Sequence, residues 1–276
     1  MRMLGIRNRA VRLVSMLTLL APLSLSAPDP PTTHSDPASP PSGHMVVVEL
    51  FTSQGCSSCP PADRVLSELG SQQNGRVIPL SFHVDYWNHD GWTDPFSRHD
   101  WTERQSAYAR LLGLRSVYTP EAVVDGRTEM VGSDTNRLRG AIATAAQKTA
   151  ASVSIHLELE KSKVAVTAAV DRPEILRSRK LDLMVAVFET NLVTSVGKGE
   201  NGGRTLRNDY VVRSLRRAAT LSSGGSNPAS QTTTLSLDDS WKKAELGVAA
   251  FLQDPSSLEI LGAAATPLST EQRASR

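Results

Sequence analysis

The first half of the chain carries apolar segments whose spacing switches between that of buried strands and that of helices. Val46–Thr52 is an apolar run typical of a strand buried on both faces, with Glu49 as its one charged residue. Ala62–Leu69 has helical spacing, and Val77–His83 is a second apolar strand. Four further elements are predicted: a helix over Trp101–Leu112, a strand over Ala122–Arg127 that enters an Asp-Gly turn, its partner over Thr128–Val131, and a helix capped by Asp134 or Thr135 that runs to Gln147. The predicted order over residues 45–150 is βαβ, then α, then ββα.

Beyond Ala150 the pattern changes to alternation of apolar and polar positions. Val153–Leu159 alternates, a Lys-Ser-Lys turn follows, and Val164–Val170 alternates again. The other strand candidates are Leu181–Glu189, Asp209–Leu215, Thr232–Leu237, Gly247–Gln253 and Leu258–Ala263. About seven short strands joined by turns are typical of an antiparallel β-sandwich. We therefore predict a separate β-rich domain over residues 151–265.

The N-terminal residues 1–27 have the pattern of a secretory signal peptide. A basic start precedes the apolar stretch Leu13–Leu25, and small residues lead up to Ala27. An uncleaved N-terminal anchor is the alternative, although the apolar run is short for a membrane span. The Pro- and Ser-rich segment 28–44 is expected to be a disordered linker, and 266–276 a disordered tail. We therefore predict an exported protein, periplasmic or secreted, with no stable membrane span after cleavage.

Composition narrows the classes of partner. The 276 residues, 39% of them hydrophobic, are enough for about two domains with a real core. The net charge is +2, and no basic stripe is interleaved with aromatic residues, so we do not expect a nucleic-acid partner.

Cys56 and Cys59 are the only cysteines, and they form a Cys-Ser-Ser-Cys motif between the first strand and the first helix. A thiol where a helix begins is stabilised as its thiolate by unpaired backbone N–H groups and the helix dipole. A second thiol about a turn further on can resolve a mixed disulfide. In the oxidising compartment that export implies, this spacing predicts a redox-active disulfide.

The order of elements around the motif resembles that of thioredoxin. Tyr118-Thr119-Pro120 stands where thioredoxin-like proteins place a cis-proline facing their CxxC. Several stretches also resemble an exported bacterial family of unknown function, the domain-of-unknown-function family 1223: Val48–Asp63, His83–Trp87, Gly91-Trp92, Asp94–Phe96, Tyr118–Pro120, Gly203–Leu206 and Val248–Leu261. The resemblance implies a thioredoxin-like fold. We thus expect an α/β protein with a thioredoxin-like domain over 45–150, followed by the antiparallel β-sandwich-like domain.

Position in this arrangement suggests a role for each motif residue. Cys56 is the expected nucleophile, nearer the helix start and more exposed, and Cys59 the resolving thiol. A cis Pro120 would expose backbone that pairs with a bound thiol peptide and would keep metals off the dithiol, with Thr119 and Tyr118 beside the substrate. An ordinary trans-proline at a strand start is the alternative.

In thioredoxins, a buried acid on the equivalent strand helps to deprotonate the resolving cysteine. Glu49 resembles that acid but lies one residue further from the cysteines. A buried carboxylate there could shuttle a proton. The alternative is a structural pair with an arginine.

The end of the second strand supplies further candidates for substrate binding. His83, Asp85 and Trp87 lie at the C-terminal edge of a parallel sheet, where ligands gather, and His83 and Asp85 share a face by the period of two. They could tune Cys56 or bind a substrate. Alternatively, they could pair with each other and pack the Trp87–Trp92 loop. Gly197–Arg204 lacks the pattern of a phosphate loop and is expected to be a flexible hairpin loop.

The leading hypothesis is an exported thiol–disulfide oxidoreductase that acts on a protein or small-molecule thiol or disulfide, without cofactor or metal. The alternative is a thioredoxin-fold copper-binding or chaperone protein whose soft ligands are Cys56, Cys59 and His83. A third possibility is a structural disulfide in a binding module, although so short a disulfide loop stabilises little.

Overall fold

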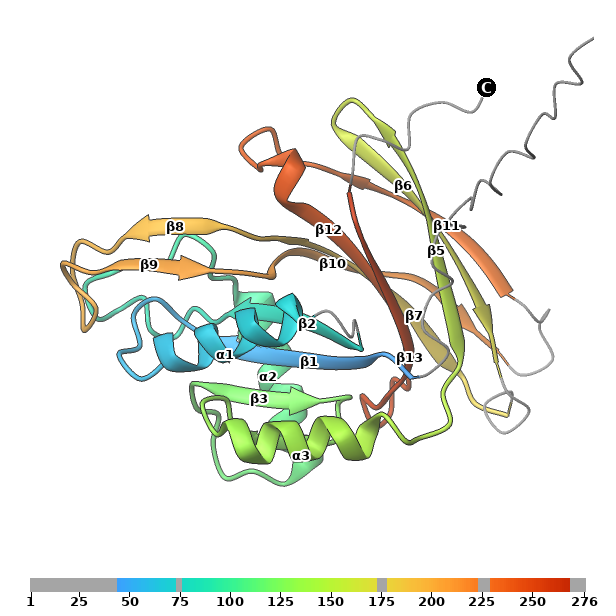
Figure 1. The fold of residues 1–276 in the computed structure, drawn as a ribbon, viewed down its shortest axis with the longest axis horizontal. Helices are drawn as coiled ribbons and strands as arrows, with labels where there is room; N and C mark the ends of the chain where they lie inside the picture. The colour runs from blue at the N-terminus through green and yellow to red at the C-terminus, as the bar shows by residue number, and fades with distance from the viewer. Residues whose placement is uncertain (1–43, 73–75, 173–177, 223–228, 269–276) are drawn as a thin grey trace, which may run out of the picture. The chain divides into compact units, whose positions relative to one another are not determined.

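The structure is a computed structural model that describes residues 44–72, 76–172, 178–222 and 229–268 (Figure 1). Of these residues, 44% lie in strands and 19% in helices. The predicted signal peptide, the predicted linker except His44, and residues 269–276 of the predicted tail lie outside the described ranges. In the part of the chain that is described, no helix combines the length and hydropathy that a membrane span requires.

Strands and helices alternate in the first half, in the order predicted from the sequence. The elements are β1 (Val46–Thr52), α1 (Pro60–Ser71), β2 (Val77–His83), α2 (His99–Leu112), β3 (Glu121–Val124), β4 (Thr128–Val131) and α3 (Thr135–Ala145). Prolines open α1, where the first N–H groups have no helical partner and their loss costs nothing. Helix α2 ends at Gly113 in the left-handed region, and the Asp134 carboxylate caps α3 by accepting from the Arg137 N–H at 3.1 Å.

The helices cover opposite faces of the strands. Alternate residues of β1, Val46, Val48 and Leu50, pack in one apolar cluster with α1 and α3. The intervening Val47 and Phe51 pack in a second cluster with α2. Strand β1 is therefore buried on both faces, as its apolar sequence predicts.

Strands dominate the second half. The elements are β5 (Ser152–Glu160), β6 (Lys163–Asp171), β7 (Leu181–Glu189), β8 (Leu192–Ser195), β9 (Thr205–Asn208), β10 (Val211–Leu221), β11 (Ala229–Ser236), the short helix η2 (Lys243–Glu245), β12 (Leu246–Gln253) and β13 (Ile260–Pro267). Strand β13 continues into the first residues of the predicted tail. The short hairpin strands β8 and β9 were not predicted.

A single sheet of eight strands joins the two halves, in the order β13-β12-β7-β10-β2-β1-β3-β4. Strand β1 pairs in parallel with β2 and antiparallel with β3, so the strand after the second helix returns beside the first. Strand β10 meets β2 in parallel at one pair, Val211 opposite Ser81, where the Ser81 N–H donates to the Tyr210 carbonyl at 2.8 Å.

The three-stranded sheet β11-β6-β5 covers the β7 and β12 part of the large sheet (Figure 1). Apolar residues of β5, β6, β7 and β12 form one core between the two layers, including Val166, Val185 and Ala250, each 0% exposed. The other face of β7 and β12 packs into the same cluster as α2.

The predicted fold class, a thioredoxin-like α/β domain followed by an antiparallel β-sandwich-like domain, is wrong. The described chain is mainly β, and strands from both predicted regions share one mixed sheet. The physical reason is that an apolar run shows that a strand is buried but not which strand lies beside it. The pattern placed strand β10 in a separate sandwich, but β10 pairs with β2 at Val211 and Ser81.

Candidate functional site

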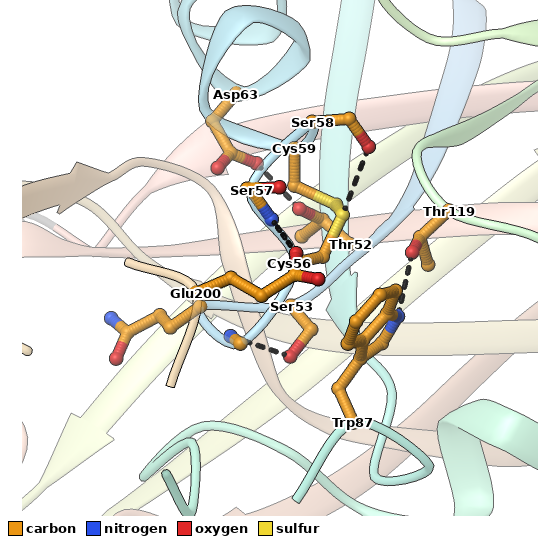
Figure 2. Close-up of a disulfide and its surroundings, with 12 residues drawn as sticks. Thr52, Ser53, Cys56, Ser57, Ser58, Cys59, Asp63, Trp87, Thr119 and Glu200 are labelled. Carbon is orange, nitrogen blue, oxygen red and sulfur yellow. Dashed lines mark hydrogen bonds between the residues drawn. A yellow bond between two sulfur atoms is a disulfide. The ribbon is translucent and has the colours of Figure 1, made fainter. Parts of the chain in front are cut away.

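The Cys-Ser-Ser-Cys motif links the C-terminal end of β1 to the start of α1, and its cysteines form a disulfide (Figure 2). Their Cα atoms lie 5.5 Å apart. Cys59 is the N-cap of α1, and its carbonyl accepts from the N–H groups of Ala62 and Asp63 at 2.9 and 3.1 Å. Both cysteines are 0% exposed, whereas Ser57 and Ser58 are exposed. The prediction that Cys56 lies nearer the helix start and is more exposed than Cys59 is therefore wrong.

A tight turn holds Cys56 against the loop that carries Trp87. The Cys56 N–H donates to the Ser53 carbonyl at 3.2 Å. A side chain at Gly55 would place its Cβ 3.1 Å from the Trp87 Cβ, so the turn needs glycine for close approach. Trp87 in turn donates from Nε1 to the Thr119 Oγ1 at 2.8 Å, and Figure 2 shows both side chains beside the disulfide. The structure thus brings together Trp87 and Thr119 with the motif.

The Thr119–Pro120 peptide bond is cis, as predicted. Pro120 is buried, and its carbonyl accepts from the Gly132 N–H at 2.9 Å. A Cβ built at Gly132 would lie 3.5 Å from the Pro120 Cβ and 3.2 Å from the Ala62 Cβ, so Pro120 adjoins the first turn of α1. That Pro120 faces the CxxC, as the resemblance to thioredoxin implies, stays a prediction.

Next to the disulfide lies a set of buried polar side chains that we call the buried polar cluster: Thr52, Gln54, Asp63, His83, Asp94 and Asn208. Sequence reasoning named only His83 among them as a candidate. A common signal is present in hindsight, since Thr52, His83 and Asn208 are each the last residue of a strand and Asp63 lies in the first turn of α1.

Asp63 is the acid of the cluster that lies closest to the motif along the chain. Its carboxylate accepts from the Thr52 hydroxyl at 2.9 Å and from the Asn208 amide at 3.3 Å. Burial raises the pKa of Asp63 to about 6, against the lowering effects of His83 and the Thr52 hydrogen bond. A carboxyl so placed can exchange a proton near neutral pH.

His83 pairs with Asp94, not with Asp85. The His83 Nδ1 lies 2.7 Å from an Asp94 oxygen that also accepts from the Gln54 N–H at 2.8 Å. Burial alone would lower the pKa of His83, but the carboxylates of Asp94 and Asp63 together outweigh it, and the pKa is raised. Burial likewise opposes ionisation of Asp94, whereas His83 and backbone N–H donors lower its pKa. Within the described ranges, His83 Nε2 is buried without a hydrogen-bond partner.

The second half of the chain completes the cluster through the β8–β9 hairpin. The Gln54 amide donates to the Asn208 Oδ1 at 2.9 Å across 154 residues. At the hairpin tip, fully buried Asn201 donates from Nδ2 to the carbonyls of Gln54 and Cys56, both at 2.9 Å. Glu200 accepts from the Ser57 N–H at 2.9 Å. The segment expected to be a flexible hairpin loop is therefore a hairpin tip fixed to the motif.

Glu49 lies on the α2 side of β1, away from the face that α1 covers. It is 0% exposed, and its carboxylate accepts from Arg104 Nε at 2.5 Å and from the Tyr108 hydroxyl at 2.7 Å. Gln253 donates to the same tyrosine at 3.1 Å. The pairing with an arginine, which the sequence left open, is the one observed.

Two other candidates lie apart from the motif's hydrogen-bond network. Asp85 accepts from the Thr102 hydroxyl at 2.6 Å and lies 3.2 Å from His99 Nδ1, at the first turn of α2. The Tyr118 hydroxyl donates to Glu129. Asp85 therefore anchors the start of α2.

A metal site at Cys56, Cys59 and His83 finds no support in the geometry of the described residues. No group of three or more His, Cys, Asp or Glu side chains is placed there to hold a metal ion. In addition, the Nδ1 of His83 is engaged by Asp94.

Comparison with known families decides the affiliation. A family model described as "Protein of unknown function (DUF1223)" matches residues 47–253. The chain belongs to the DUF1223 family. The matched residues include the motif, the buried polar cluster and the tip of the β8–β9 hairpin, so all of these lie within what the family model covers. No curated protein matches the chain.

Two solved structures are similar to this DUF1223 chain over most of its length. A crystal structure of protein AGR_C_4864 from Agrobacterium tumefaciens is 30% identical, with a TM-score of 0.64 over 85% of this chain and 99% of that one. HBP35 of Porphyromonas gingivalis is 17% identical, with a TM-score of 0.60 over 83% of this chain and 76% of that one. The second likeness concerns the fold alone.

Proposed function

We propose that this protein is an exported thiol–disulfide oxidoreductase whose redox-active group is the Cys56–Cys59 disulfide. The observation that carries the proposal is the closed CxxC disulfide at the start of α1, with the buried, ionisable Asp63 in the first turn of the same helix. A disulfide at a helix N-terminus is suited to exchange, because the helix end stabilises the thiolate that opening produces.

The cycle that these residues support is written from the reduced form. Cys56 is the proposed nucleophile because its sulfur lies 3.3 Å from the hydroxyl of Ser58, an exposed residue of the motif. The Cys56 thiolate attacks one sulfur of the partner's disulfide, a mixed disulfide forms, and the partner's other sulfur leaves as a thiolate that takes a proton from solvent. Cys59 then loses its proton and attacks the Cys56 sulfur. This step re-forms the Cys56–Cys59 disulfide and releases the second partner thiol. An external dithiol returns the protein to its reduced form, and with a dithiol partner the same steps run in reverse.

Asp63 is the group best placed to take the proton from Cys59. It lies one helical turn after Cys59, and its own N–H donates to the Cys59 carbonyl at 3.1 Å. Its pKa of about 6 matches the requirement that a general base be poised near the operating pH. In this mechanism Asp63 takes the role that the sequence suggested for Glu49, whose carboxylate is held by Arg104.

A purely structural disulfide is the competing explanation. A bridge between residues three apart closes a short loop and stabilises less than one that closes a long loop. A staple also gives no reason to bury two carboxyl groups and a histidine beside it, since each must be compensated by partners.

Export is part of the proposal and rests on the N-terminal sequence. Its test is the N-terminal sequence of protein recovered from periplasmic or culture fractions. Cleavage near Ala27 is the expected result, and intact protein confined to the cytoplasm would contradict it.

The redox activity is tested by trapping. In a Cys59→Ser variant, Cys56 should accumulate mixed disulfides with glutathione, whereas the matched Cys56→Ser variant should accumulate few. The wild-type disulfide should open and close reversibly in glutathione buffers. A disulfide that resists these buffers, or equal trapping by both variants, would contradict the proposed function.

A further inference from the structure

The tip of the β8–β9 hairpin places a negative charge at the residue that follows Cys56. Glu200 Oε2 accepts from the Ser57 N–H at 2.9 Å, and Figure 2 shows the Glu200 side chain lying alongside the motif. The hydrogen bonds from Ser57 lower the pKa of Glu200, so the carboxylate is ionised at neutral pH. This acid comes from a part of the chain 143 residues away.

The position of Glu200 is built into the fold. Its neighbour Asn201 is 0% exposed and donates to the carbonyls of Gln54 and Cys56. The Asn201 Oδ1 accepts from Arg204 at 2.7 Å, which ties both ends of the tip together. Gly199 and Gly203 adopt φ values of 75° and 79°, the left-handed region in which glycine carries no steric penalty. The tip is therefore held against the motif by a buried side chain with its hydrogen bonds satisfied.

The carboxylate opposes the charge that develops when the disulfide opens. A thiolate at Cys56 would be stabilised by backbone N–H groups of the motif and of the start of α1, and Glu200 already accepts from the one that follows Cys56, the Ser57 N–H. It also brings a like charge close to the sulfur, which disfavours ionisation. Asp63, which unlike the exposed Glu200 is buried, lies in the first turn of α1 and is bonded to Thr52 and Asn208.

We propose that Glu200 is a positioning residue that sets the redox poise of the Cys56–Cys59 pair by disfavouring the Cys56 thiolate. The inference rests on the proposed function and deepens it. Because a destabilised thiolate makes the reduced form less favourable, Glu200 holds the pair toward the disulfide. The balanced reaction is the protein disulfide plus two glutathione thiols, which gives the protein dithiol plus one glutathione disulfide.

The test compares the full-length protein with a Glu200→Gln variant, which keeps the shape and an acceptor but removes the charge. The matched control is Glu68→Gln, a change at an exposed carboxylate of α1, the helix that follows the motif. Each protein is equilibrated in glutathione buffers at pH 7, and the fraction of free thiols gives the equilibrium constant. The pH dependence of Cys56 alkylation is measured in a Cys59→Ser background.

We expect Glu200→Gln to raise the equilibrium constant for reduction by roughly threefold, as for an exposed charge interaction. For a two-electron couple this is about 14 mV. The alkylation midpoint should move to lower pH, and both effects should shrink in 1 M salt because the Debye length falls to about 3 Å. Glu68→Gln should match wild type.

Two results would overturn the inference. One is an equilibrium constant of Glu200→Gln equal to or below that of wild type while the wild-type pair equilibrates normally. The other is an equal shift in Glu68→Gln, which would make the effect one of net charge. A wild-type disulfide that glutathione cannot open would instead overturn the proposed function itself.

Discussion

Replacing Asp63 with asparagine should make the oxidised protein more stable at pH 8, although it removes a hydrogen-bonded side chain. Burial raises the pKa of Asp63 from 3.8 to about 6, so the folded state disfavours the carboxylate. At about 1.4 kcal/mol per pKa unit, this difference destabilises the ionised folded protein by about 3 kcal/mol. Because the folded-state pKa lies above the unfolded one, this cost is absent below pH 3.8 and complete above about pH 6.

The asparagine would keep an acceptor for the Thr52 hydroxyl, but its amide hydrogens would face the Asn208 amide that now donates to Asp63. Losing this hydrogen bond costs about 1 kcal/mol of the roughly 3 kcal/mol gained by removing the buried charge, so the free energy of unfolding should rise by about 2 kcal/mol at pH 8. At pH 4 most of the electrostatic gain should be absent, and the lost hydrogen bond should leave the variant slightly less stable than wild type. Urea unfolding of the oxidised protein at both pH values, followed by circular dichroism, measures the difference. Asp239→Asn, at an exposed position, is the control and should change little.

The same variant should slow closure of the disulfide from a Cys56 mixed disulfide at pH 7, because the proposed proton acceptor is gone. A stability difference between Asp63→Asn and wild type that is the same at pH 4 and pH 8 would refute the electrostatic reasoning. Unchanged closure kinetics would refute the role of Asp63 while leaving the stability argument intact.

Three further substitutions test other parts of the structure. Glu49→Gln leaves the Arg104 guanidinium without its charged partner in a site where the two side chains are 0% and 10% exposed, so urea unfolding should show a loss of about 3 kcal/mol, with an unchanged glutathione equilibrium. Gly126→Ala should cost at least about 2 kcal/mol in the same assay, because φ is +68° and the new Cβ would lie 2.0 Å from the Leu258 carbonyl oxygen. Asp94→Asn removes the partner that raises the pKa of His83. Because its pKa is raised, His83 contributes most to stability below pH 6.5, its ordinary pKa. Because its pKa is lowered, Asp94 contributes most above pH 3.8. The loss of stability in Asp94→Asn should therefore be greatest between pH 3.8 and pH 6.5, and it should shrink as the pH rises through the raised pKa of His83. A deficit independent of pH would contradict this reading.

Local elements could be predicted from the sequence because their signals are local. The apolar run Val77–His83 and the stretch Thr128–Val131 match the observed strands residue for residue, and the helix predicted over Ala62–Leu69 is extended to Pro60–Ser71. The order of strand, CxxC and helix placed the cysteines correctly at the start of α1.

The partners of these elements could not be predicted, because periodicity reports burial but not neighbours. Strand β10 reads as one of several alternating strands, yet it joins β2 and merges the two expected regions into one sheet. Likewise, Glu49 was a candidate proton carrier because the sequence does not show that Arg104 of α2, 55 residues later, lies beside it. Asn208 and Glu200 reach the motif only through a hairpin whose short strands carry too few residues for a periodic signal.

Because the chain is synthesised from its N-terminus, the hydrogen bonds from the β8–β9 hairpin to the motif can form only late in biosynthesis. Asn208 is made 145 residues after Asp63, which is about 15 s later at roughly 10 residues per second. During that interval the motif exists without Glu200, Asn201 or Asn208, and therefore without the contacts that we propose tune it. Within the chain each cysteine has only the other as a partner, so the nascent polypeptide cannot form a wrong internal disulfide. The motif consequently has its complete surroundings only in the finished chain, when the last third has folded back on the first.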